Sequence, residues 1–225
     1  MKYKAIIFDM DGTIIDTNHI WEKATEILLK QKLGSFPTSL KDEICMETHG
    51  QCLANSCLII KMKANLTEDV PTLIQEKLKI ADELYRTGTS LMPGFAEFHK
   101  KIQTLNLKTG IATNASNSTI RITNEALNLK QFFNEHIYGI SHVNYIAKPA
   151  PDLYLHTAKQ IDVSPEYCIA IEDSPSGVKA AKSAGMFCIG YNSSKDKNAL
   201  KECDIIVDSY DEICLDQILI RSKVK

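Results

Sequence analysis

The hydrophobic and polar positions of this chain change their periodicity along its length. From residue 92 onward, short apolar runs with strand character alternate with stretches whose apolar residues recur at helical spacing. Strands are predicted over residues 3–8, 107–112, 136–140, 167–171, 186–191 and 204–207, and helices over 95–105, 118–127, 152–160, 176–184 and a terminal segment. Because alternating strand and helix units build parallel sheets, the pattern predicts an α/β fold, a doubly wound parallel sheet with helices on both faces.

Residues 18–86 have a helical pattern throughout, with predicted helices over 21–33, 38–46, 52–62 and 70–85. This all-α segment interrupts the α/β pattern directly after its first strand. We therefore predict two domains, an α/β core of residues 1–17 and 87–225 and an inserted helical cap of residues 18–86. Since ligands of open α/β sheets bind at the carboxyl ends of the strands, an insertion at this point would act as a lid over the site.

Composition and charge favour a globular protein that acts on small molecules. The 225 residues are 44% hydrophobic, and 26 basic and 28 acidic residues give a net charge of -2. So small a charge argues against nucleic acid or an anionic membrane as a partner. No apolar run approaches the ~20 residues of a membrane span, and no signal peptide precedes the first strand, so we expect a cytoplasmic protein. A monomer is the default expectation.

The seven cysteines are scattered and never form a C-x-x-C motif. They are Cys45, Cys52, Cys57, Cys168, Cys188, Cys203 and Cys214. An odd number of cysteines, several of them in apolar runs such as residues 167–171, favours reduced and mostly buried thiols over disulfides or a zinc site.

Two carboxylates, Asp9 and Asp11, stand at the end of the first predicted strand. Alternate strand residues share a face, so both acids can point into one site. A carboxylate there can attack phosphorus as a covalent nucleophile, and a second one nearby can serve as acid and base. Two like charges so close need a cation, for which the hard, oxygen-liganded Mg²⁺ is the natural choice. The alternative is that both residues only form Asx-turns or cap a helix.

Further polar groups stand at the end of the predicted strand 107–112 and at the end of the apolar segment 145–147. Thr113 and Asn114 offer a hydroxyl, an amide and backbone N–H groups suited to phosphate oxygens. Lys148, held by the stiff linkage to Pro149, can supply a fixed positive charge to a phosphoryl group or a crowded carboxylate. Taken alone, Thr113 could equally cap a helix, and Lys148 could be a solvated surface residue.

A second pair of acids, Glu172 and Asp173, comes directly after the predicted strand 167–171 and before a predicted helix. Acid pairs at helix starts often only interact with the helix dipole. A Mg²⁺ site shared with Asp9 and Asp11 would nevertheless require such a pair, because the ion takes a few carboxylates besides water and phosphate oxygens.

Taken in order, the motifs D-M-D-G-T, T-N, K-P and E-D-S-P-S-G, each at a predicted strand end, closely resemble those of the haloacid dehalogenase superfamily. The resemblance covers residues 2–208. The helical insertion, Asp16 and the run over residues 172–186 resemble the phosphoglycolate phosphatase and β-phosphoglucomutase branch. This resemblance implies a Rossmann-like core with a helical cap, Mg²⁺ as cofactor and a small phosphomonoester as substrate.

The resemblance also implies a role for each candidate residue. Asp9 would be the nucleophile that forms an aspartyl-phosphate, and Asp11 would protonate the leaving oxygen and then activate water. Lys148 would be a catalytic residue that offsets the charge around the phosphoryl group, which Thr113 and Asn114 would bind. The implied metal ligands are Asp9, the backbone carbonyl of Asp11, Glu172 and Asp173.

The predicted cap departs from the mutases of this branch. Those mutases resemble one another in a His in the first cap helix and an Arg a few residues after a cap Gly. Here Trp21 falls where that His would be, and residues 51–53, which follow Gly50, include no Arg. The departure favours a phosphatase over a mutase. Trp21 would pack either against the substrate, as in sugar-phosphate phosphatases of the branch, or in apolar space between lid and core.

We therefore predict a Mg²⁺-dependent phosphatase that hydrolyses a small phosphorylated metabolite, a sugar phosphate or a phosphoglycolate-like compound, through an aspartyl-phosphate. A β-phosphoglucomutase-like phosphomutase is the alternative on the same fold. A non-enzymatic phospho-switch and a catalytically dead binding protein are further alternatives. Receiver modules, however, run to about half this length without a helical insertion, and the whole candidate set is intact here. No motif in the cap identifies the substrate.

Overall fold

The computed structural model describes residues 2–48 and 51–220, apart from the side chains of residues 18 and 220. Contacts divide the chain into two compact units, Met1–Asp16 with Ser90–Lys225, and Thr17–Thr89. Both breaks lie within three residues of those predicted between core and cap. The assignment of the two units as a catalytic core and a lid stays a prediction.

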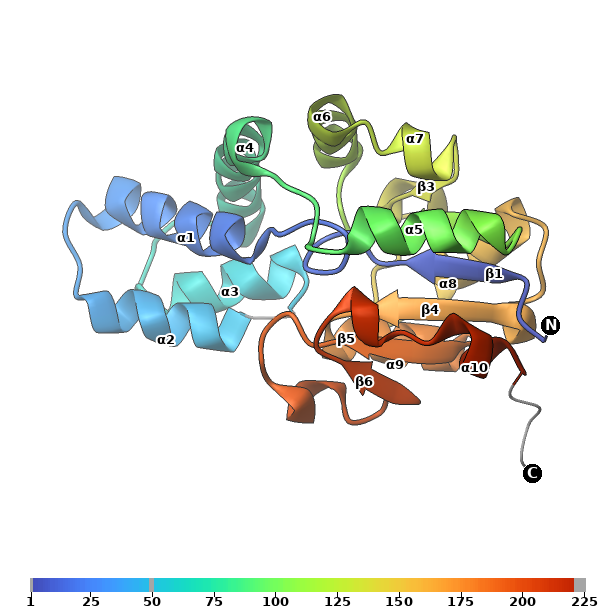
Figure 1. Cartoon of the computed structure of the whole chain (residues 1–225). Helices are drawn as coiled ribbons and strands as arrows, with labels where there is room; N and C mark the ends of the chain where they lie inside the picture. The colour runs from blue at the N-terminus through green and yellow to red at the C-terminus, as the bar shows by residue number, and fades with distance from the viewer. Residues whose placement is uncertain (1, 49–50, 221–225) are drawn as a thin grey trace. The chain divides into compact units, whose positions relative to one another are not determined.

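The first unit is built on a sheet of six parallel strands in the order β3-β2-β1-β4-β5-β6 (Figure 1). The strands are β1 Ala5–Phe8, β2 Lys108–Ala112, β3 Ile137–Tyr138, β4 Cys168–Glu172, β5 Phe187–Tyr191 and β6 Ile205–Val207. Strand β1 pairs with β2 through Ile7 opposite Gly110, and with β4 through Ile7 opposite Ala170. The predicted α/β class with a doubly wound parallel sheet is confirmed.

The residues of β1 explain why this strand lies at the centre of the sheet. All four are buried. Ile6 and Phe8 belong to the apolar core on one face, and Ala5 and Ile7 to the core on the other, as the alternation of strand side chains requires. A strand that is apolar on both faces is typical of a parallel sheet with a helical layer on each side.

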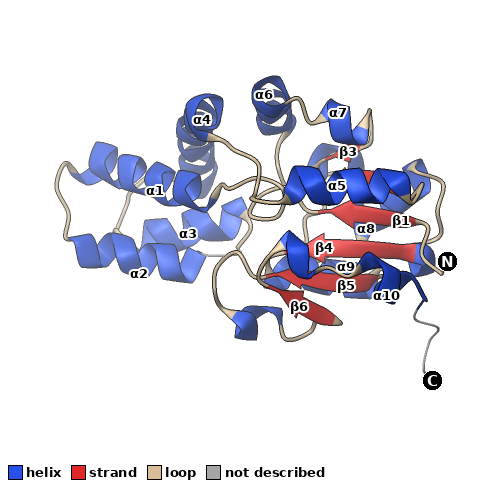
Figure 2. Cartoon of the chain, in the orientation of Figure 1, coloured by secondary structure: helices blue, strands red, loops and turns tan. Residues whose placement is uncertain are grey.

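Helices cover both faces of the sheet (Figure 2). The helices of this unit are α5 Phe95–Thr104, α6 Asn117–Leu127, α7 Lys130–Phe133, α8 Asp152–Gln160, α9 Pro175–Ser183 and α10 Leu215–Ile220. On one face, the Phe8 ring meets Phe95 of α5 and Phe133 of α7 edge-on, with centroids 5.7 and 5.6 Å apart. On the other, Tyr154 of α8 and Val178 of α9 complete the core. Helices on both faces therefore hold β1 rigidly behind its polar end.

The predicted strand over residues 136–140 is too long. Strand β3 contains only Ile137–Tyr138, and a 3₁₀ turn over Ile140–Val143 follows. The reason is local, because the Gly139 N–H donates to the His142 ring nitrogen at 3.1 Å instead of extending the strand pairing. Helix α7 escapes prediction because four residues are too few to show a helical period.

The seven cysteines are free thiols of differing exposure. Cys57, Cys168 and Cys188 are buried, Cys214 is exposed, and the other three are half-buried. The prediction of buried thiols thus holds for three of them. Burial raises the pKa of Cys168 to about 12, so this thiol stays protonated and unreactive at neutral pH.

The second unit contains the helices α1 Asn18–Leu33, α2 Thr38–Thr48, α3 Leu53–Lys63 and α4 Val70–Gly88. As predicted, helices are the only regular secondary structure of its described residues. Its core is formed by Leu28 and Leu29 of α1 together with Ile44, Ile60 and Leu73. Across the chain, none of the described helices is both long and apolar enough to cross a membrane.

Lys77 of α4 is buried in the second unit with little to balance its charge. The residue is 2% exposed, its Nζ donates to Ser56 Oγ at 3.3 Å, and it lies 5.7 Å from the centre of the Trp21 ring. No carboxylate within residues 2–48 and 51–220 forms an ion pair with it. Burial therefore holds the pKa of the Lys77 ammonium below its ordinary value. The desolvation of this ammonium therefore lowers the free energy of unfolding of the helical unit.

We expect Lys77→Met to raise the free energy of unfolding of the helical unit by about 1–3 kcal/mol at pH 7, because a buried polar group is replaced by an apolar side chain of similar length. Between the lowered folded pKa and the unfolded value of ~10.4, the unfolded state binds more protons, so wild-type stability rises with pH. The advantage of the variant should therefore shrink toward pH 10. Urea unfolding followed by Trp21 fluorescence measures it, since Trp21 is the single tryptophan and belongs to this unit.

Lys32→Met is the matched control in the same unit. The Lys32 ammonium lies 2.9 Å from Glu68 and 2.7 Å from Glu76, and these carboxylates raise its pKa. Its loss should lower stability by ~1 kcal/mol or less, the usual value of a surface pair. A Lys77→Met protein that is less stable than wild type would contradict the interpretation of Lys77 as an unbalanced buried amine.

Candidate active site

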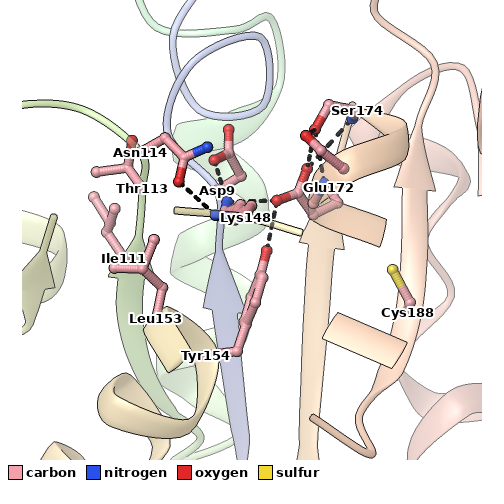
Figure 3. A network of polar contacts seen from close by, with 12 residues as sticks. Asp9, Ile111, Thr113, Asn114, Lys148, Leu153, Tyr154, Glu172, Ser174 and Cys188 are labelled. Carbon is pink, nitrogen blue, oxygen red and sulfur yellow. Dashed lines mark hydrogen bonds and ion pairs between the residues drawn. The ribbon is translucent and has the colours of Figure 1, made fainter. Parts of the chain in front are cut away.

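The candidate residues that follow β1, β2 and β4 come together at the carboxyl ends of these strands (Figure 3). Asp9 follows β1, and Thr113 and Asn114 follow β2. Glu172 is the last residue of β4, and Asp173 comes next. Because the three strands are parallel neighbours, their ends lie side by side, where ligands of open α/β sheets bind.

Lys148 is held between two carboxylates. Its Nζ lies 2.5 Å from Asp9 Oδ1 and 2.5 Å from Glu172 Oε1, and all three side chains are buried. Burial alone would lower the pKa of the Lys148 ammonium, but the two carboxylates together raise it above its ordinary value. Lys148 is therefore a cation at neutral pH, and it links the end of β1 to the end of β4.

The carboxylates outnumber this cation. Burial raises the pKa of Asp9 well above its ordinary value, and Lys148 opposes the shift, whereas Glu172, Asp173 and Asp11 add to it. Burial also raises the pKa of Asp173 to about 7, together with repulsion from Glu172. Lys148 balances only part of this negative charge, so the site favours the binding of a further cation.

The residues present fit a Mg²⁺ ion. Asp9, Glu172 and Asp173 each offer a carboxylate oxygen, and these atoms lie within 4.8 Å of one another. Carboxylate oxygens are the ligands that this hard cation prefers, and a site with one to three of them leaves places for water and substrate oxygens. The buried acidic group thus supports the prediction of a metal site, and the identity of the ion belongs to the proposal below.

Glu172 makes hydrogen bonds through both of its oxygens. Oε1 accepts from Lys148 Nζ and from the Tyr154 hydroxyl at 2.8 Å, and Oε2 accepts from the backbone N–H and the hydroxyl of Ser174 at 3.3 and 3.1 Å. A Cβ at Gly177 would lie 1.8 Å from Glu172 Oε1, so only glycine fits there. Tyr154 was missed by sequence reasoning, because a tyrosine on the apolar side of a helix gives only a core signal.

Asn114 fixes the loop that carries Lys148. Its Oδ1 accepts the backbone N–H of Lys148 at 3.0 Å. Neighbouring Thr113 is buried, and its Oγ1 accepts the N–H of Ala115 at 3.0 Å. Both residues thus stand beside Asp9 and Lys148 as expected (Figure 3), and their role in binding phosphate stays a prediction.

Asp11 lies half-buried in the turn after β1, where its backbone pairs with Ile15. Its carboxylate adds to the raised pKa values of Asp9 and Asp173, which places it close to both. Gly12 makes the turn possible: its φ is 76°, and a Cβ there would lie 2.0 Å from Asp173 Oδ2. The turn after β1 can therefore approach the end of β4 closely enough to share one site.

The departures from the mutase pattern fall in the helical unit. Trp21 lies in α1, where its ring meets Tyr85 edge-on at 6.1 Å, so it packs within its own unit. Leu53 begins α3. His49 and Gly50 lie outside the described residues, so the prediction that rests on Gly50 is not addressed by the structure.

Comparison with known proteins gives the family. The model of the haloacid dehalogenase-like hydrolases matches residues 6–191. A phosphorylated carbohydrates phosphatase of Thermotoga maritima is 27% identical over 183 residues, 81% of this chain and 82% of that protein. The β-phosphoglucomutase of Bacillus subtilis is also 27% identical, over 95% of this chain and 92% of its own length.

A solved structure supports the fold. The haloacid dehalogenase hydrolase of family IA, variant 3, from Entamoeba histolytica matches with a TM-score of 0.82 and 24% identity, over 96% of this chain and 97% of that one. The predicted core with an all-helical insertion is thereby confirmed. The family match and several phosphatases among the relatives also confirm the prediction of an enzyme of the phosphatase type. The chain belongs to the haloacid dehalogenase-like hydrolases.

Proposed function

We propose that this hydrolase is a Mg²⁺-dependent phosphatase that releases phosphate from a small phosphorylated metabolite through an aspartyl-phosphate on Asp9. The observation that carries the proposal is the buried Lys148 ammonium, 2.5 Å from both Asp9 Oδ1 and Glu172 Oε1 at the carboxyl end of the sheet. It holds Asp9 in one orientation and provides a positive charge beside the position of a transferring phosphoryl group. Phosphoryl transfer depends mainly on such positioning and charge.

In the first step, Asp9 would attack the phosphorus atom of the substrate. Lys148 occupies Oδ1 of Asp9, which leaves Oδ2 as the attacking oxygen. As the Oδ2–P bond forms, the bond between phosphorus and the leaving oxygen breaks. Asp11, two residues after Asp9 in the turn that follows β1, would give its proton to that oxygen and release the alcohol.

In the second step, the aspartyl-phosphate would be hydrolysed. Asp11, now ionised, would take a proton from a water molecule whose oxygen attacks phosphorus. The Oδ2–P bond breaks, which restores the Asp9 carboxylate and frees inorganic phosphate. Thr113 would donate its hydroxyl hydrogen to a phosphoryl oxygen, since its Oγ1 accepts only the Ala115 N–H among the recorded contacts of the described residues.

Asp9, Glu172, Asp173 and the backbone carbonyl of Asp11 would hold the Mg²⁺ ion. When bound, the ion neutralises charge on the carboxylates and on the phosphoryl oxygens. Burial and repulsion between the acids raise the pKa values of Asp9 and Asp173, which supports the binding of a cation by these carboxylates.

The substrate we propose is a sugar phosphate or a similar small phosphomonoester. The Thermotoga maritima relative is a phosphatase of phosphorylated carbohydrates, which supports this class. The Bacillus subtilis relative favours a second candidate function, a phosphomutase. We prefer hydrolysis because Trp21, at the position where mutases of the branch have a His, is packed against Tyr85.

Asp9→Asn should abolish turnover and the covalent phosphate, because an amide cannot act as the nucleophile. Asp11→Asn should slow the reaction about 10²–10⁴-fold, the range for lost acid–base catalysis. Steady-state phosphate release and acid-quenched labelling with ³²P-substrate measure both effects. Asp162→Asn is the control, because this exposed carboxylate lies 4.0 Å from Lys108 and forms no other ion pair within residues 2–48 and 51–220. Near-normal turnover of Asp9→Asn would show that the nucleophile is another residue.

EDTA should abolish activity and Mg²⁺ should restore it, because the buried carboxylates need a cation before an anionic substrate can approach. Ca²⁺ should substitute poorly, since its looser and higher coordination misplaces the phosphoryl group. Phosphate release measured across a titration of each ion tests this. Full activity in excess EDTA would refute the requirement for a metal.

Hydrolysis and isomerisation can be separated by ³¹P NMR of glucose 1-phosphate with the Mg²⁺-loaded enzyme, with and without a glucose bisphosphate. A mutase must protect its aspartyl-phosphate from water until a second substrate arrives. We expect inorganic phosphate from this or another sugar monophosphate, without stimulation by the bisphosphate. Accumulation of glucose 6-phosphate with little free phosphate would establish the mutase instead.

A further inference from the structure

Tyr154 touches both members of the buried ion pair that the proposed mechanism uses. Its hydroxyl donates to Glu172 Oε1 at 2.8 Å, and its ring centre lies 5.0 Å from Lys148 Nζ (Figure 3). The side chain is fully buried. It comes from α8, whereas Glu172 ends β4, so the contact joins two elements through residues that are 18 positions apart in the chain.

The hydroxyl is one of the donors that orient the Glu172 carboxylate. Oε1 accepts from Lys148 and Tyr154, and Oε2 accepts from the backbone N–H and the hydroxyl of Ser174. The Lys148 ammonium has three N–H donors and serves Asp9 as well as Glu172, at 2.5 Å from each. The Tyr154 hydroxyl donates its single hydrogen to Glu172 Oε1, so this contact orients Glu172 without involving Asp9.

We propose that Tyr154 is a positioning residue of this enzyme, which acts through Glu172. Its hydroxyl holds Oε1 of Glu172 in the orientation in which the carboxylate faces Lys148 and, with Asp9 and Asp173, the proposed metal site. Tyr154 itself touches neither the phosphoryl group nor the ion. The inference rests on the proposed function for its effect on turnover, but its effect on metal binding is independent of the substrate.

The alternative is that Tyr154 only fills space under the sheet. It belongs to the apolar core that also contains Leu153, Ala158 and Val178, so its ring has a structural role in any case. Phenylalanine would occupy the same volume and leave that packing intact, but it cannot donate a hydrogen bond. Tyr154→Phe therefore separates positioning from packing.

The test is Mg²⁺ binding to the full-length protein by isothermal titration calorimetry, without substrate. Tyr154→Phe should weaken the Mg²⁺ dissociation constant about 10-fold or more, the usual effect of losing a hydrogen bond to a metal ligand. At saturating Mg²⁺, kcat should fall while KM for the phosphate ester stays within about twofold, because the hydroxyl does not touch the substrate. Tyr3→Phe is the matched control, since the buried Tyr3 has its hydroxyl against Lys2 at the other end of β1.

A double-mutant cycle shows whether Tyr154 acts through Glu172. On a Glu172→Gln background, Tyr154→Phe should change kcat/KM at saturating Mg²⁺ by less than twofold, because the interaction is already disrupted. Equal and independent losses in the two backgrounds would overturn the proposal. So would a Tyr154→Phe protein that binds Mg²⁺ as tightly as wild type and differs only in melting temperature.

The two proposals fail in different ways. If wild type releases phosphate from no ester but binds Mg²⁺ at least 10-fold more tightly than Tyr154→Phe, the proposed function is wrong and the positioning role stands. If wild type is an active phosphatase and Tyr154→Phe matches it in both Mg²⁺ affinity and kcat, the positioning role is wrong and the proposed function stands.

Discussion

The ammonium of Lys148 between the carboxylates of Asp9 and Glu172 is the interaction on which the rest of the site depends. Removing one partner of such a buried group leaves an uncompensated charge, which typically costs about 3–5 kcal/mol. The surrounding contacts can be understood as support for this one arrangement. Asn114 holds the backbone of Lys148, and Tyr154 and Ser174 hold Glu172. Three strand ends and a loop are thereby locked around one nitrogen atom.

The same arrangement leaves an electrostatic imbalance that the sheet must tolerate. Burial and mutual repulsion raise the pKa values of Asp9 and Asp173, so these buried carboxylates by themselves oppose folding. The free energy that offsets this repulsion comes from the apolar core next to the site. Phe8, the residue before Asp9, is fully buried among Phe95, Phe98 and Phe133. An apolar core on each face of β1 thus holds a polar end in a conformation that its own charges oppose.

The sequence predicted the features that depend on hydrophobic periodicity and on residues at strand ends. It did not predict contacts between side chains that come together only in the folded chain. Asp9 and Glu172 were predicted to converge because the ends of parallel strands meet at one edge of a sheet. Lys148, predicted to end a strand, instead comes from the loop between the 3₁₀ turn Ile140–Val143 and α8. Tyr154 was missed because its hydroxyl meets Glu172 only once α8 has packed against the sheet. Strand β3 was drawn too long because the His142 ring takes the Gly139 N–H, a bond that no hydrophobic pattern reveals. Side-chain partners of this kind decide local geometry without changing the apolar pattern.

The two lysines that are buried among the described residues show that the charged partners of a buried amine, rather than burial itself, decide the direction of its pKa shift. Lys148 and Lys77 are 3% and 2% exposed. Two carboxylates raise the pKa of Lys148, whereas Lys77, beside a hydroxyl and an aromatic ring, has its pKa lowered. The desolvation is comparable, so the difference in sign must come from Asp9 and Glu172. A cation is therefore available at the sheet edge because two acids are buried with it, and those same two acids belong to the group that would hold the metal. The two buried acids thus keep Lys148 protonated, and the protonated Lys148 supplies the positive charge that phosphoryl transfer requires.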